Sequence, residues 1–163
     1  MIRSRLLVPI TAILLLTVAG LLGYQYLQHA NGEIRLPVVE GCALHLDTCS
    51  ANFPGGGRMT LAITPRQPSA TDALQVNASF EQLEPGVVGV RFKGIDMNMG
   101  YLEHFVFDLK KTEADKKQIS FSGKAGVFVC SSNLMQWLVL VRVQVGETRY
   151  EVPFRFETRQ QQG

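Results

Sequence analysis

The chain reads LMQWLVLVRVQVGETRYEVPFRFE over residues 134–157, and this stretch decides the fold. In its first half every second residue is apolar, at Trp137, Val139, Val141 and Val143. Because successive side chains of a strand point to opposite faces of a sheet, the pattern predicts a central strand with one face in a core. Gly146-Glu147 then matches a two-residue type II′ turn leading into a second strand. Pro153 in that second strand predicts an edge position or a bulge.

Working outward from this hairpin, the residues between 41 and 130 read as short alternating segments separated by turn residues. The predicted strands cover residues 58–64, 74–80, 87–93, 102–109, 118–122 and 126–130. The charged segment 110–117 is expected to form a turn or a short helical corner. Because no segment after residue 30 has a sustained 3.6-residue apolar period, the sequence predicts an all-β domain. We expect an immunoglobulin/cupredoxin-like antiparallel sandwich.

The N-terminal part of the chain has the composition of a membrane anchor. Residues 6–27 carry no formal charge, and as a helix this segment would span about 33 Å, enough for a bilayer core. Arg3 and Arg5 precede it, so the positive-inside rule places the N-terminus in the cytoplasm and the rest of the chain on the far side. We therefore expect an anchor over residues 1–27, a linker over 28–40, a domain over 41–157 and a flexible tail over 158–163.

The alternative for the same segment is a cleaved signal peptide. The best cleavage position follows Ala30, but Gln28 then occupies the third position upstream, where a small residue is preferred. Both alternatives deliver the domain to an extracytoplasmic, oxidising space.

Charge and motif content exclude several classes of function. Without Arg3 and Arg5 the chain has 14 basic and 14 acidic residues, so no basic surface is predicted and we expect no nucleic-acid partner. The sequence contains no Gly-x-Ser-x-Gly elbow, no phosphate-binding loop and no dinucleotide fingerprint. We therefore expect a protein that is not an enzyme.

The three cysteines leave several pairings open. Cys42 and Cys49 are close enough in sequence to bridge a small loop. Either of them pairs with Cys130 in a second alternative. In a third, the thiols are free metal ligands, although the pattern Cys42-x-x-His45-x-x-x-Cys49 fits no zinc motif.

Sulfur-containing residues recur at two predicted loops. Met97 and Met99 stand two residues apart, and Cys130 is followed by Met135 at the start of the long strand. Thioether and thiolate groups are the ligands that Cu(I) prefers, so these four residues are the predicted metal ligands, with His104 as a fifth. The alternative is that the methionines fill the core and Cys130 is a small buried residue.

The segments Met97-Asn98-Met99-Gly100 and Met135-Gln136-Trp137 resemble those of the FixH/YtkA-like group over roughly residues 85–157. Members of that group are small, membrane-anchored bacterial proteins associated with copper delivery and cytochrome oxidase assembly. The resemblance implies a single-pass inner-membrane protein with a periplasmic domain, partnered by a membrane metalloenzyme or its assembly complex. A metal-free, immunoglobulin-like module that scaffolds a membrane complex is the second expectation.

Overall fold

The computed structural model describes residues 16–21, 33–68, 72–95, 105–114, 118–127 and 134–159. The chain divides into two units, Met1–Gly32 and Glu33–Gly163. In the first unit residues 16–21 are helical, and the rest of the predicted anchor lies outside the described residues. Within the described ranges, no helix has both the length and the apolar character needed to cross a membrane.

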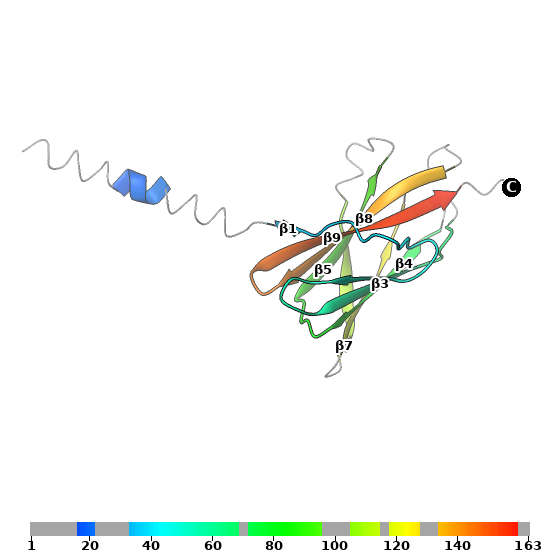
Figure 1. Ribbon diagram of the computed structural model, residues 1–163, viewed down its shortest axis with the longest axis horizontal. Coiled ribbons are helices and arrows are strands. Elements are labelled where there is room, and N and C mark those ends of the chain that lie inside the picture. The colour runs from blue at the N-terminus through cyan, green and yellow to red at the C-terminus, as the bar shows by residue number, and fades with distance from the viewer. Residues whose placement is uncertain are drawn as a thin grey trace, which may run out of the picture. The chain divides into compact units, whose positions relative to one another are not determined.

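The second unit is built of strands (Figure 1), which confirms the predicted all-β class. Its described residues form nine strands: β1 Glu33–Arg35, β2 Cys49–Asn52, β3 Arg58–Thr64, β4 Leu74–Glu81, β5 Val87–Gly94, β6 Phe107–Ala114, β7 Gln118–Ala125, β8 Leu134–Val145 and β9 Thr148–Arg159.

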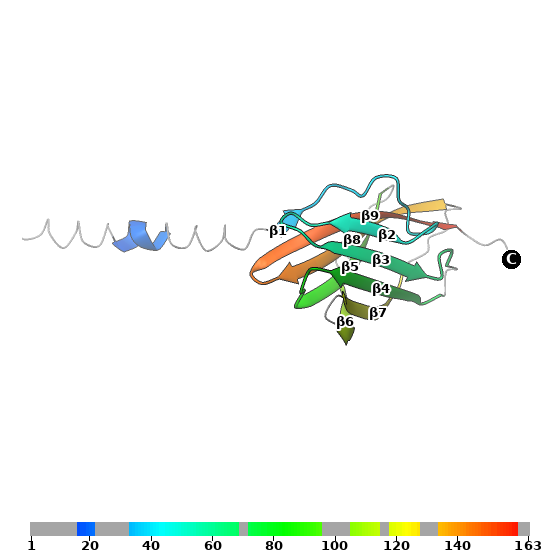
Figure 2. The same ribbon diagram turned by 60° about the horizontal axis from the view of Figure 1, so that its bottom comes forward.

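These strands form one curled sheet in the order β1-β9-β8-β5-β6-β7-β4-β3-β2. Figure 2 shows β2, β3, β4 and β7 lying side by side in one half of it. All pairs are antiparallel except β1 with β9, so the sheet is mixed rather than purely antiparallel as predicted. A parallel pair needs a long crossover connection. Here the connection from β1 to β9 contains all the other strands, so no local pattern could predict the pair.

Strand β6 joins the two halves of the sheet. Its first residues, Phe107 to Leu109, pair with β5, whereas Lys110 to Ala114 pair with β7, with a register shift between Lys111 and Glu113. The turn predicted over residues 110–117 is therefore wrong for residues 110–114. These residues have a strand neighbour on one side, and charged side chains are common on such partly open edges because they discourage further pairing.

The core lies between the two halves of the sheet and draws apolar side chains from both. The predicted core face of β8 is confirmed, because Trp137, Val139, Val141 and Val143 are all buried. The Trp137 indole N–H donates a hydrogen bond of 3.0 Å to the hydroxyl of Thr158, which is also buried. Strand β9 thus reaches residues that were expected in the polar tail.

The predicted β8–β9 hairpin is confirmed along its whole length. Its register runs from Leu134 opposite Arg159 to Val145 opposite Thr148. Gly146 has φ of +58°, as the first position of the turn requires. Pro153 lies beyond the end of β1, and its carbonyl accepts a hydrogen bond from the Val39 N–H. The Pro153 nitrogen, which has no hydrogen to donate, thus faces an irregular segment rather than a paired strand.

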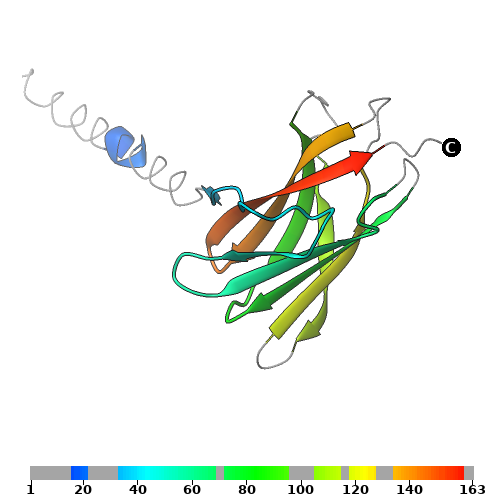
Figure 3. The same cartoon turned by 45° about the vertical axis from the view of Figure 1, so that its right-hand side comes forward.

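That irregular segment, residues 36–48, connects β1 to β2, and we call it the strap. It runs beside β9 (Figure 3), where the N–H groups of Leu36, Val39 and Leu44 donate to β9 carbonyls at 2.8–3.1 Å. Leu44 is buried in the core, and Cys42 forms a disulfide with Cys49. Residues 33–40, expected in the linker, are therefore joined to the sheet and cover the edge of β9.

Candidate functional site

Met135 is the one predicted metal ligand that lies among the described residues. It is the second residue of β8, opposite Thr158 of β9, and its side chain belongs to the core with an exposed fraction of 3%. Because Met135 and Trp137 share the inward face of β8, a metal site containing Met135 must lie at the end of the core. Met97, Met99, His104 and Cys130 lie outside the described residues.

The strand ends next to Met135 show where the two predicted ligand segments join the sheet. Gly94, the last residue of β5, pairs with Trp137, and the next N–H, of Ile95, donates a 3.0 Å hydrogen bond to the Gln136 carbonyl. Met97 follows Ile95 by two residues, and Cys130 precedes Leu134 by four. The segments carrying these residues therefore join the sheet on neighbouring strands at one end.

The structure shows which two cysteines form a disulfide. The S–S distance between Cys42 and Cys49 is 2.00 Å, so the first of the three pairings is confirmed. Neither sulfur is then available as a thiolate, and the alternative in which both are free ligands is wrong. His45, between them in sequence, lies with its Nε2 3.6 Å from a carboxylate oxygen of Glu157. Within the described ranges, no group of three or more His, Cys, Asp or Glu side chains could hold a metal ion.

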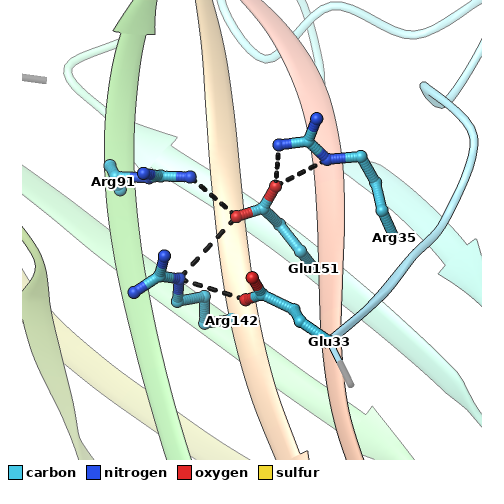
Figure 4. Close-up of polar contacts among 5 residues, drawn as sticks. All are labelled: Glu33, Arg35, Arg91, Arg142 and Glu151. Atoms are coloured by element: carbon cyan, nitrogen blue, oxygen red, sulfur yellow. Dashed lines mark hydrogen bonds and ion pairs between the residues drawn. The ribbon is translucent and has the colours of Figure 1, made fainter. Parts of the chain in front are cut away.

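A second cluster, of charged side chains, lies on the outer face of the sheet around Glu151 (Figure 4). Glu151 lies between Val152, a core residue, and Tyr150, which packs against the core, and it points to the opposite face, yet its side chain is only 2% exposed. Arginine side chains from three neighbouring strands cover it. They are Arg35 of β1, Arg91 of β5 and Arg142 of β8.

Each carboxylate oxygen of Glu151 has its own guanidinium partners. Oε1 accepts from Arg35 Nε at 2.7 Å and from Arg35 Nη2. Oε2 accepts from Arg91 Nη2 at 2.8 Å and lies 3.7 Å from Arg142 Nε. Arg142 Nε also lies 3.2 Å from Oε1 of Glu33 in β1. One carboxylate thus connects four strands that lie side by side, β1, β9, β8 and β5.

The electrostatics of this cluster keep Glu151 ionised. Burial by itself raises the pKa of the carboxyl group, because it penalises the charged form. The hydrogen bond from Arg35 and the charges of Arg91, Arg35 and Arg142 act in the opposite direction and outweigh burial, so the pKa of Glu151 is lowered. A carboxylate held in this way is a counter-ion for arginine, and it is poorly suited to accept a proton in catalysis. The cluster therefore has the chemistry of a structural connection.

No signal in the sequence pointed to this cluster. Arg91 is 60 residues from Glu151 and Arg35 is 116 residues from it. Glu151 itself occupies an outward position of an alternating strand, where a polar residue is ordinary.

Comparison of the chain with protein-family models, curated proteins and solved structures finds no match. The resemblance to the FixH/YtkA-like group therefore stays a prediction. The functional proposal rests on the residues of this chain and on the geometry around Met135.

Proposed function

We propose that this protein is anchored in the bacterial inner membrane by residues 6–27 and handles copper in the periplasm, or assists assembly of a membrane metalloenzyme. The proposed ligands for Cu(I) are Met97, Met99, Cys130 and Met135, with His104 as a further donor. The proposed role is binding and transfer rather than catalysis. The anchored unit is proposed to be a sandwich of the immunoglobulin/cupredoxin-like type.

The observation that carries this proposal is the hydrogen bond between Ile95 N–H and the Gln136 carbonyl. It places the end of β5 beside the start of β8, so the chain segments that carry the other proposed sulfur ligands are attached next to Met135. Four sulfur donors from two chain segments suit Cu(I), which accepts thioether and thiolate ligands and needs few of them.

The disulfide gives independent support to the proposed compartment and ligand set. Disulfides form and persist in oxidising spaces such as the periplasm. Because Cys42 and Cys49 are paired, Cys130 is the one cysteine left to act as a thiolate. Metal binding is one way to protect such a thiol from oxidation.

A second candidate function is a metal-free module that scaffolds a membrane complex. The specific observation in its favour is the burial of Met135, whose exposed fraction of 3% is that of a core residue. A thioether that only fills space contacts apolar neighbours and is replaceable by leucine without loss of function.

Cu(I) binding by the full-length protein in detergent, in competition with a chelator, separates the two functions. We expect about one equivalent of Cu(I), and weaker binding in Met97→Leu, Met99→Leu and Met135→Leu, because carbon cannot replace sulfur as a donor. Each exchange roughly preserves side-chain volume and should cost less than about 1.5 kcal/mol of stability.

Met59→Leu is the matched control for this experiment. Met59 is fully buried in β3, in the other half of the sheet, so its replacement should affect packing alone. Copper binding equal to wild type in all three ligand variants, or no binding by the parent protein, would favour the scaffold function.

A further inference from the structure

Residues 33–41, at the start of the β-strand unit, make fewer buried contacts than residues 42–48, which follow them. Residues 33–35 are all exposed, and no residue from 33 to 43 is fully buried. The first fully buried side chain is that of Leu44. Strand β1 has three residues, and β9 is its one partner among the described strands. Beyond β1, the backbone hydrogen bonds of Leu36 and Val39 join this region to β9, and the partly buried side chains of both residues pack against the core.

From Cys42 onward the strap is fixed by several independent contacts. The disulfide joins Cys42 to Cys49, which is fully buried in β2. Leu44 packs in the core, and the guanidinium of Arg66 donates to the Leu46 carbonyl at 2.7 Å. The boundary between the weakly held and the strongly held parts therefore lies at Cys42.

We propose that residues 33–41 are a releasable tether, which detaches from β9 without unfolding of the domain and is stopped at the Cys42–Cys49 disulfide. While β1 is paired, the chain first contacts the domain at Glu33. After release the first fixed residue is Cys42, which lies closer to the end of the sheet that carries Met135. The release itself is independent of metal binding, whereas its use in presenting Met135 to a membrane partner rests on the proposed function.

The arginine cluster lowers the free-energy cost of detaching β1. When β1 detaches, Glu151 loses Arg35, but Arg91 remains 2.8 Å from Oε2 and Arg142 remains 3.7 Å from it. A buried carboxylate that kept no partner would strongly oppose release. Because these two partners stay in place, Glu151 keeps part of its charge compensation, although it loses both hydrogen bonds from Arg35. Arg35, with an exposed side-chain fraction of 63%, is already largely hydrated before release.

The register along β9 shows how far the attachment point moves. In the docked state Glu33 lies opposite Arg149, and Met135 lies opposite Thr158. Nine residues of strand separate these positions, about 30 Å at 3.3 Å per residue. Ala43, next to the disulfide, lies beside Arg155. Three residues of strand, about 10 Å, separate that position from Thr158. The attachment point thus moves about 20 Å toward the Met135 end.

Hydrogen exchange of the full-length protein in detergent, followed by mass spectrometry, tests the tether. We expect the amides of Leu36 and Val39 to exchange through a local opening that low denaturant concentrations do not accelerate. Amides of β8 should exchange only through global unfolding. If the amides of Leu36 and Val39 were protected from exchange as strongly as the amides of β8, the proposal would be overturned.

Two perturbations test the parts of the tether separately. Glu33→Gln removes the ion pair with Arg142 and should speed exchange at Leu36 and Val39 about 1.5- to 5-fold, the value of an exposed pair. Glu147→Gln, in the exposed β8–β9 turn, is the matched control and should change neither rate.

Reduction of the disulfide tests whether the Cys42–Cys49 bond limits how far the tether detaches. Protection should then also fall over residues 43–48, and an unchanged boundary would contradict the role assigned to Cys42–Cys49. None of these measurements requires copper, so absence of Cu(I) binding would overturn the proposed function and leave the tether intact.

Discussion

Replacement of Glu151 by glutamine should destabilise the domain even though the new side chain has nearly the same shape. Glutamine keeps a hydrogen-bond acceptor at the same position but removes the negative charge that faces Arg35, Arg91 and Arg142. The three guanidinium groups then repel one another, with Glu33 as the remaining carboxylate in contact with the cluster. The change therefore isolates the electrostatic contribution of Glu151 from its packing.

The size of the effect follows from the exposure of each arginine. Removing one partner of a fully buried ion pair costs about 3–5 kcal/mol. Arg35 and Arg142 have exposed side-chain fractions of 63% and 42%, so water replaces much of what they lose. Arg91 is only 15% exposed and carries most of the penalty. We expect Glu151→Gln to lower the free energy of unfolding by about 2–3 kcal/mol at neutral pH.

The same residue predicts a pH dependence with a defined sign. The pKa of Glu151 is lower in the folded protein than in the unfolded chain, so the unfolded state binds the proton more tightly. Its stabilising contribution is therefore complete above the unfolded pKa, near 4.5, and is lost as the pH falls through the lower, folded pKa. The difference in stability between wild type and Glu151→Gln should shrink over the same acidic range.

Denaturant unfolding followed by the fluorescence of Trp137, the one tryptophan of the chain, measures both effects. Glu113→Gln is a suitable control, because Glu113 is exposed on β6 and its replacement should change stability by less than about 0.5 kcal/mol. A Glu151→Gln variant as stable as this control at neutral pH would refute the reasoning. So would a difference from wild type that stays constant as the pH falls.

Two further predictions concern the core. Trp137→Ala should cost about 3–5 kcal/mol in denaturant unfolding followed by circular dichroism, since it removes a large buried side chain. A midpoint close to wild type would contradict the assigned core position. Leu44→Ala should cost about 2–5 kcal/mol because it leaves a cavity where the strap enters the core. Leu46→Ala, two residues away and exposed, should cost less than about 0.5 kcal/mol, and similar losses in both variants would argue against the strap as part of the core.

Strand periodicity explains the part of the fold that was predictable. Trp137 and the valines that alternate with it identified the core face of β8, and Gly146 with Glu147 identified the hairpin. These features depend on neighbours within a few residues, which is the range over which alternation and turn chemistry act. The candidate site was predictable to a smaller extent. Met135 was named as a candidate ligand from the sequence, and its alternation with Trp137 indicates an inward side chain, but its burial at the end of the core appears only in the folded structure.

The sequence by itself determined the β class, the β8–β9 hairpin and the core face of Trp137, whereas it left the pairing of the cysteines open. Only the tertiary structure decided the parallel docking of β1, the course of the strap and the burial of Glu151 on an outward face. The physical reason is the same for all three. Their partners lie on β9, β8 and β5, which are distant in sequence, and hydrogen bonds and ion pairs formed across such distances leave no periodic pattern in the chain.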